Sequence, residues 1–542
     1  MFSPLFVGSV PAVIESTDKR WARVYRYLAM HQRAPARAEL ESILARHPTS
    51  GAAHLMLGGL LADDDRLQAA ARHVLESARH PPGDPGVLGD LIAALIRVGE
   101  IVVARRLLDH PAITTSASVH VLLRAATQLQ TLGEHHAALG LIERAREAGA
   151  HGRVFLFSRA IQLLFNGRLS EAEAELERCV AIEPPLGQGY LHLARARTQT
   201  PASNHLQAIT RALANVAPGG EDHASLEFAR YKELEDLQRH DEAWQALARG
   251  NALLHAQLPH DSARESALFE RLIEVCTPEF LRQQSARIDD GPQPIFVIGM
   301  PRSGTTVLER MLCNHSRVES TGELGDFPRA LAFATDHVAP VMLDETTVAR
   351  LPQVDWAGVG RRYLAQTRWR ARGKAFYVDK LPRNWMLAGL IHRALPHARI
   401  VRVVRDPMDV CFSNWRACFG VAPEFAYAYD LDTLAAHFML YQRVLTHWQR
   451  ALPGVILDVD YARLVQDPEA TVRDILAFCD LAYEPGCADL TRNATPVATF
   501  SAPQVREPIH TRSFREWEPY ATQLQGLASA LSGASTSQDS AL

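Results

Sequence analysis

Turn residues in the N-terminal half of the chain recur at a fixed spacing. Gly99, Gly133 and Gly167 lie 34 residues apart, and an alanine follows each of them five positions later. Asp65 and Gln238 extend this register to an earlier and a later repeat, again with alanine at plus five. Helix-period apolar residues fill the segments between these turns. The spacing therefore predicts about six stacked helix–turn–helix units, an all-helical solenoid.

The pattern resembles the tetratricopeptide repeat (TPR). The seventh residue before the turn is small in three units, as close packing of two helices requires: Gly58, Ala126 and Ala160. The resemblance predicts repeats over residues 20–258, after an N-terminal extension of residues 1–19. Two interpretations of the solenoid stay open. It could offer a groove for a peptide or protein partner, or it could only support a second domain.

Length and composition limit the remaining possibilities. A chain of 542 residues is too long for one core, so a second large domain is expected. The formal net charge of −4 gives no reason to expect nucleic-acid binding, and no apolar run of about 20 residues predicts a membrane span. The seven cysteines are scattered and form no CxxC pair or zinc-site spacing, so neither a disulfide framework nor a metal site is expected. Cysteine usage of this kind predicts a cytoplasmic location.

A phosphate-binding loop follows a predicted helical linker of residues 259–290. The apolar run 295–298 reads as a buried strand, and it enters a glycine-rich turn that leads into a helix. Thr305 stands where a Walker loop has its lysine, so a nucleotide kinase is disfavoured. The candidate phosphate-binding residues of the loop are Arg302, Ser303, Gly304, Thr305 and Thr306.

This loop, PRSGTT, resembles the 5′-phosphosulfate loop of sulfotransferases, in the form found in tyrosylprotein sulfotransferases. A second motif agrees with it, because a predicted strand ends at Arg405-Asp406-Pro407 and Ser413 follows eight residues after Arg405. The resemblance assigns the 3′-phosphate of the donor to Arg405 and Ser413. It implies a three-layer α/β domain with a parallel sheet and a P-loop-like turn over residues 291–522. The expected donor is 3′-phosphoadenosine 5′-phosphosulfate (PAPS), which leaves 3′-phosphoadenosine 5′-phosphate (PAP), and no metal is expected.

The same resemblance assigns the catalytic groups. Glu323 matches the glutamate that acts as general base, and Lys380 matches a lysine on the bridging and transferred oxygens. Lys380 is one of only four lysines in a chain whose cations are otherwise arginines, which favours a role for a compact point charge. Arg302 is a further candidate cation for the transferred group. His315 remains the rival base.

The C-terminal part carries the last assignments. Tyr461 matches a tyrosine near the nucleotide, and Ser501 and Arg512 match a lid-like segment. Residues 523–542 are rich in serine, alanine and glycine and are predicted to be disordered.

Together these features predict a PAPS-dependent sulfotransferase that acts by in-line displacement on an acceptor hydroxyl. The acceptor is open, with a preference for a protein or peptide tyrosine. Two alternatives remain: a TPR interaction scaffold with an inactive sulfotransferase-like domain, or, less favoured, a nucleotide kinase.

Overall fold

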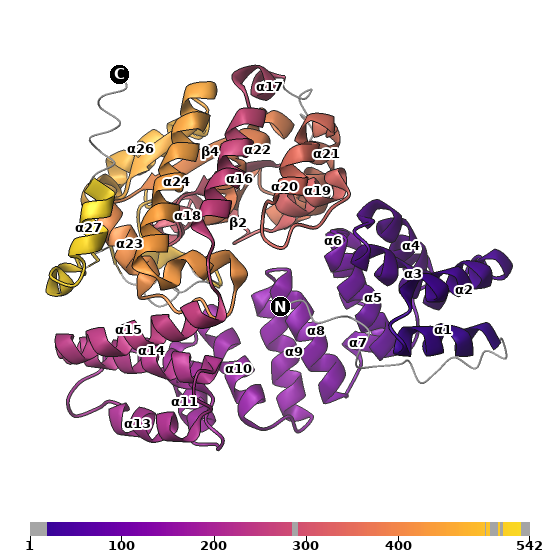
Figure 1. The fold of residues 1–542 in the computed structure, drawn as a ribbon, viewed down its shortest axis with the longest axis horizontal. Coiled ribbons are helices and arrows are strands. Elements are labelled where there is room, and N and C mark those ends of the chain that lie inside the picture. Colours follow the sequence, from indigo (N-terminus) through magenta and orange to yellow (C-terminus); the bar gives the residue numbers. More distant parts are fainter. Residues whose placement is uncertain (1–18, 284–290, 494, 499–507, 510–512, 533–542) are drawn as a thin grey trace. The chain divides into compact units, whose positions relative to one another are not determined.

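A computed structural model describes residues 19–283, 291–493, 495–498, 508–509 and 513–532. The chain forms two compact units (Figure 1). The first joins Met1–Ala150 to Gly325–Trp369, and the second joins His151–Leu324 to Arg370–Leu542. Among the helices in the described part of the chain, none has both the length and the apolar character that a membrane crossing requires.

The first unit is helical throughout its described residues. Its helices are α1 (Lys19–Ala29), α2 (Arg33–Arg46), α3 (Gly51–Asp63), α4 (Leu67–Arg79), α5 (Pro85–Arg97), α6 (Ile101–Leu108), α7 (Pro111–Thr114), α8 (Val119–Thr131), α9 (His135–Glu147), α19 (Asp326–Thr335), α20 (Glu345–Arg350) and α21 (Trp356–Thr367).

The second unit begins with further helical hairpins and continues into an α/β region. Its helices are α10 (Arg153–Phe165), α11 (Leu169–Val180), α12 (Gly187–Ala196), α13 (Leu206–Asn215), α14 (Glu221–Asp236), α15 (His240–Gln257), α16 (Ser262–Val275), α17 (Pro278–Arg282), α18 (Thr305–Cys313), α22 (Ala388–Ala394), α23 (Pro407–Trp415), α24 (Leu431–Ala451), α25 (Tyr461–Gln466), α26 (Pro468–Phe478) and α27 (Gln525–Ser532).

The predicted repeat turns are confirmed by their backbone geometry. All five turn residues have positive φ angles: 54° at Asp65, 78° at Gly99, 79° at Gly133, 77° at Gly167 and 59° at Gln238. A left-handed residue ends the first helix of a hairpin, so the chain can reverse into the second. Two units therefore make the same turn without glycine.

Close packing inside a repeat explains the predicted small position. A Cβ atom added to Gly58 of α3 would lie 2.6 Å from Val74 Cγ2 of α4, well inside van der Waals contact. The two helices approach too closely for any side chain here, as the resemblance to the tetratricopeptide repeat implies.

The segment 325–369 packs on the early repeats within the first unit. The Gln68 backbone N–H donates to Asp336 Oδ1 at 2.8 Å, next to the Asp65 turn. Arg362 of α21 donates to the Val98 carbonyl at 2.9 Å and forms an ion pair with Glu100 at 2.9 Å, next to the Gly99 turn. The turns of these repeats are thus bound by the end of α19 and by α21.

Five strands in the second unit form one parallel sheet, as predicted. They are β1 (Gln293–Ile298), β2 (Val318–Ser320), β3 (Phe376–Asp379), β4 (Arg399–Val404) and β5 (Ile456–Asp460), in the order β2-β3-β1-β4-β5. Every neighbouring pair is parallel. Because β1 lies between β3 and β4, the crevice beyond its carboxyl end is where ligands bind in open sheets of this kind.

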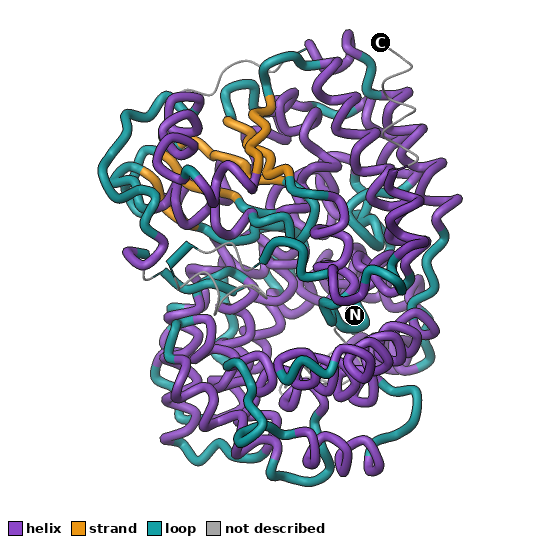
Figure 2. Tube along the Cα trace, turned by 90° about the vertical axis from the view of Figure 1, so that its left-hand side faces the viewer, coloured by secondary structure: helices purple, strands orange, loops and turns teal. Residues whose placement is uncertain are grey.

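Helices cover both faces of the sheet, which makes the predicted three layers (Figure 2). Val401 and Val403 of β4 pack in a buried cluster with residues of α18 and α26. Arg402 points to the opposite face, where its Nε donates to the Tyr441 hydroxyl of α24 at 3.0 Å.

The structure differs from the expectation for the start of the C-terminal tail. Residues 525–532, predicted to be disordered, form α27. Leu527 and Leu531 are buried, and their four-residue spacing places both on one helix face. Two leucines in a stretch of small residues are enough to dock this short helix.

Candidate active site

Five of the predicted site residues that the structure describes lie at or just beyond the carboxyl ends of the five strands. The loop with Arg302 follows β1, and Glu323 follows β2 by three residues. Lys380, Arg405 and Tyr461 each come directly after a strand, respectively β3, β4 and β5. The parallel topology therefore brings residues from five distant segments to one edge of the sheet.

The loop after β1 is shaped by conformations that favour glycine. Gly299 and Gly304 have φ angles of 155° and 107°. A Cβ atom on Gly304 would lie 2.3 Å from Tyr461 Cε2, so the tyrosine ring rests directly on the backbone that starts α18. Arg302 also has a positive φ angle, 68°, which is uncommon for a residue with a side chain.

Gly304→Ala should disrupt this contact. The added methyl group must displace the Tyr461 ring and occupies an unfavourable φ, so we expect a loss of about 2–3 kcal/mol in the free energy of unfolding and weaker nucleotide binding. Urea denaturation and calorimetry measure the two effects. Gly526→Ala is the matched control, because no atom lies within 4 Å of its added Cβ; equal behaviour of the two variants would contradict this account of Gly304.

Two buried polar atoms of the site lack hydrogen-bond partners in the described part of the chain: Ser303 Oγ and Arg405 Nε. The N-terminus of α18 also has no side-chain cap, because its N-cap residue is Gly304. A helix N-terminus with unpaired donors favours an anion. The loop residues, with Thr305 and Thr306 buried beside them, therefore fit a phosphate-like group.

The second predicted anion site adjoins the loop. Arg302 Nε donates to Ser413 Oγ at 3.3 Å, and Arg405 donates to the Arg302 carbonyl at 3.3 Å. The Arg405 guanidinium lies 4.8 Å from the centre of the Tyr461 ring. Burial, reinforced by the nearby Arg416, Arg195 and Arg405, lowers the pKa of Arg302 to about 10. A cluster of cations that disfavour one another is suited to an anionic ligand.

Glu323 and Lys380 form a close ion pair, with 2.5 Å between Oε1 and Nζ. Lys380 is buried and also lies 3.9 Å from Glu309. Burial by itself lowers the pKa of the Lys380 ammonium, but the carboxylates of Glu323 and Glu309 raise it above its ordinary value. The two carboxylates thus favour the charged form of Lys380. Glu323, with a side chain 42% exposed, faces the cavity.

His315, the rival base, lies elsewhere. Its ring is buried, and Nε2 lies 2.9 Å from the Ala482 carbonyl, while Nδ1 accepts the Arg317 backbone N–H at 3.1 Å. It is not among the described residues that line the cavity. This placement favours Glu323.

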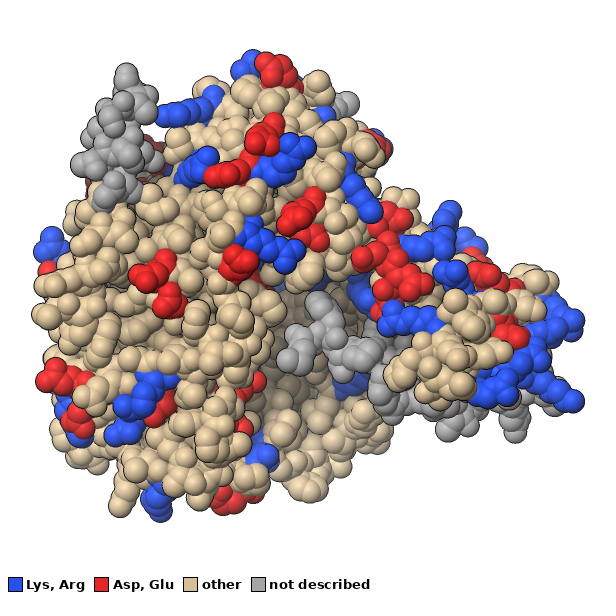
Figure 3. Space-filling view, in the orientation of Figure 1, with Lys and Arg blue, Asp and Glu red and all other residues tan. Residues whose placement is uncertain are grey.

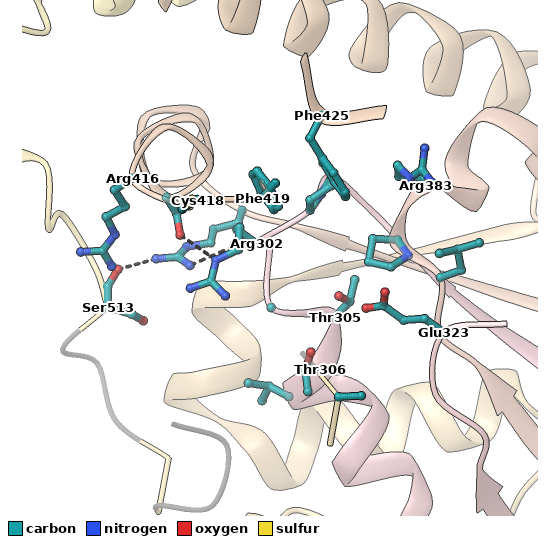
Figure 4. A pocket seen from close by; sticks show the side chains of 18 of the residues that line it. Arg302, Thr305, Thr306, Glu323, Arg383, Arg416, Cys418, Phe419, Phe425 and Ser513 are labelled. Atoms are coloured by element: carbon teal, nitrogen blue, oxygen red, sulfur yellow. Dashed lines mark hydrogen bonds between the residues drawn. The ribbon is translucent and has the colours of Figure 1, made fainter. Parts of the chain in front are cut away.

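One cavity of about 600 Å³ is lined by most of the predicted site residues: Arg302, Gly304, Thr305, Thr306, Glu323, Arg405, Ser413 and Tyr461 (Figure 4). Ser303 and Lys380 are buried next to these residues and are not in the lining. Figure 4 shows Glu323 pointing toward Thr305, with Phe425 and Arg383 across the opening. Sequence reasoning missed several residues of the lining: Arg383, Arg416, Cys418, Phe419 and Phe425 of the α/β region, and Phe165, Gln188, His192 and Glu221 of the helical repeats. None of these residues belongs to a recognisable motif. Those of the helical repeats reach the cavity only through tertiary packing, which the sequence does not show.

Ser501 and Arg512, predicted to close on the donor, lie outside the described residues. The neighbouring described residues do line the cavity. Arg405 donates to the Ser513 carbonyl, and Arg416 forms an ion pair with Glu516. The chain after Arg512 is therefore held at the cavity by its contacts with Arg405 and Arg416.

The charges of the cavity contrast with the outer surface. On the face drawn in Figure 3, acidic and basic side chains lie next to one another. One exposed example is the Arg443–Glu270 pair at 3.0 Å. Within the described residues, no group of three or more His, Cys, Asp or Glu side chains is placed to hold a metal ion.

Comparison with known proteins gives the following similarities. Residues 294–485 match the model of the sulfotransferase family. An uncharacterized protein of Aquifex aeolicus is 29% identical over 363 residues, which cover 66% of this chain and 47% of that protein. Protein-tyrosine sulfotransferase 1 of Danio rerio is 26% identical over 254 residues, 41% of this chain and 65% of the relative. The sulfotransferase domain of the Synechococcus olefin synthase aligns with 43% of this chain and 90% of its own, at 20% identity and a TM-score of 0.30. This chain thus spans about half the length of the Aquifex protein.

Proposed function

We propose, from the sulfotransferase-family domain in the C-terminal part of this chain, that the protein transfers a sulfuryl group from PAPS to an acceptor hydroxyl. The observation that carries the proposal is the pairing of two anion sites in one cavity. One is formed by the loop residues Arg302, Gly304, Thr305 and Thr306, and the other is formed by Arg405 and Ser413. A nucleotide with a 3′-phosphate as well as a 5′-phosphosulfate would satisfy both.

The residues divide the donor between them. Ser303, Thr305 and Thr306 with the α18 N-terminus hold the 5′ end, which brings the sulfuryl group to be transferred. Arg405 and Ser413 hold the 3′-phosphate through charge-assisted hydrogen bonds. Tyr461 orients the nucleotide from the position in which it covers Gly304.

Glu323 and Lys380 perform the proton and charge steps. Glu323 Oε2 makes no hydrogen bond within the described residues, so it can accept the proton of the acceptor hydroxyl as the oxygen–sulfur bond forms. The bond from sulfur to the leaving phosphate oxygen breaks in line with the new bond, and Lys380 and Arg302 stabilise the growing negative charge. Before the reaction, the carboxylates of Glu323 and Glu309 raise the pKa of Lys380 and favour its charged form.

For the acceptor we infer a protein or peptide tyrosine. The aromatic side chains of Phe419 and Phe425 lie across the cavity from Glu323 and suit a phenol ring (Figure 4). A peptide could also extend onto the helical repeats. The test is transfer of radiolabelled sulfur from PAPS to tyrosine peptides, with phenylalanine peptides as controls. Labelling of both kinds of peptide, or of neither, would contradict the acceptor assignment.

A further inference from the structure

Three carboxylates line the cavity among the described residues, and they differ in their partners. Glu323 is paired with Lys380, and Glu516 is paired with Arg416. Glu221, the first residue of α14, is solvent-exposed, and its carboxylate makes no hydrogen bond or ion pair in the described part of the chain. It is the cavity carboxylate that a ligand can engage without breaking an existing pair.

The neighbouring residue on α14 differs from Glu221 in its contacts. Asp222 accepts the Gly187 backbone N–H at 2.7 Å and so ties α14 to α12. Its carboxylate performs the structural role at this helix start, while the Glu221 side chain reaches the cavity.

Glu221 lies at the edge of the aromatic wall, the part of the cavity lining formed by Phe419 and Phe425. A Cβ atom on Gly420 would lie 3.3 Å from Glu221 Oε1, so the carboxylate lies close to the residue that follows Phe419. The Phe419 ring stacks on Phe425, with 4.2 Å between centroids and 8° between planes. The Tyr429 hydroxyl donates to the Gly420 carbonyl at 2.7 Å and holds this edge in place.

Arg383 and His192 also lie near the wall, and neither competes with Glu221 as a negative group. Arg383 lies 5.4 Å from the centre of the Phe425 ring, and its guanidinium is 3.7 Å from Glu424. His192 of α12, also in the lining, is a neutral ring, because burial and the nearby Arg195 lower its pKa to about 3. Among the carboxylates that line the cavity in the described part of the chain, Glu221 is thus the one at the wall whose negative charge is not held in an ion pair.

We propose that Glu221, a residue of the helical repeats, is a specificity residue that binds a cationic group, an ammonium or guanidinium, on the hydroxyl-bearing acceptor. This inference rests on the proposed function, since the wall serves an acceptor only if the loop and Arg405 hold the donor. It gives the repeats a direct part in selecting what is sulfated.

The experiment uses the full chain saturated with PAP and two phenols of opposite charge, tyramine and 4-hydroxyphenylpropionate. Ligand-observed NMR titration measures the affinity of each. We expect tyramine to bind more tightly, and Glu221→Gln to reduce that preference about fivefold, as the loss of one partly exposed charge pair predicts. Glu177→Gln, which removes an exposed carboxylate of α11 outside the cavity lining, should leave the preference unchanged.

The outcomes distinguish a failure of the Glu221 assignment from a failure of the proposed sulfotransferase function. If PAP binds but the preference is the same with and without the Glu221 carboxylate, or if neither phenol binds, the assignment of Glu221 is wrong and the sulfotransferase proposal stands. If PAP itself does not bind, the proposed function fails first.

Discussion

Arg405→Ala should weaken PAP binding about 100-fold and leave binding of adenosine 5′-phosphate, which lacks the 3′-phosphate, nearly unchanged. The Arg405 side chain is only 8% exposed, and removing a buried cation from a phosphate loses a charge-assisted hydrogen bond and leaves the anion poorly compensated. Titration calorimetry with both nucleotides measures the difference directly.

Arg405 also donates to the carbonyls of Arg302 and Ser513, so a structural effect must be separated from a binding effect. Arg405→Lys keeps the charge without the planar fork and should be intermediate. Arg463→Ala, at an exposed pair with Asp474, is the control for removal of an arginine. Equal losses for PAP and adenosine 5′-phosphate would remove Arg405 from the 3′-phosphate role.

Glu323→Gln should lower turnover by about 10²–10⁴-fold while PAP affinity stays within a few-fold of the parent value. The amide fills the same space beside Lys380 but cannot take the acceptor proton. Single-turnover transfer of labelled sulfur to a tyrosine peptide measures the chemical step, and calorimetry measures the affinity.

Two further variants test whether a loss of turnover is specific to Glu323. Glu469→Gln removes an exposed carboxylate of α26 and should not change turnover. His315→Gln tests the rival base, which lies in a buried hydrogen-bonded position. Retained turnover in Glu323→Gln together with a large loss in His315→Gln would reverse the assignment.

Much of the fold could be predicted because local rules decide it. Positive φ angles at Asp65 and Gln238 match the glycine turns, since the 34-residue register fixes where a helix must end. The strand before Gly299 is a short apolar run, and the strand before Arg405 is rich in isoleucine and valine; both end in turn signals. The two anion motifs each follow a predicted strand, and the carboxyl ends of parallel strands lie at the same edge of a sheet. Their proximity could therefore be predicted as well.

The remainder depends on contacts between distant segments. Nothing in the sequence of residues 325–369 indicates that α19–α21 pack on the repeat turns at Asp65 and Gly99. The lining of the cavity by Glu221 and Gln188 is equally hidden, because polar residues at helix starts are ordinary in any solvent-exposed repeat. Only tertiary packing distinguishes them from their neighbours.

Titration calorimetry of the full chain without added metal, with PAP in one experiment and ATP with Mg²⁺ in another, tests the central claim most directly because it requires no acceptor. Two anion sites in one cavity predict tight binding of PAP in the absence of metal and little binding of ATP with Mg²⁺. Binding of ATP with Mg²⁺ in preference to PAP, or no binding of either nucleotide, would contradict the assignment of this site to a PAPS-dependent sulfotransferase.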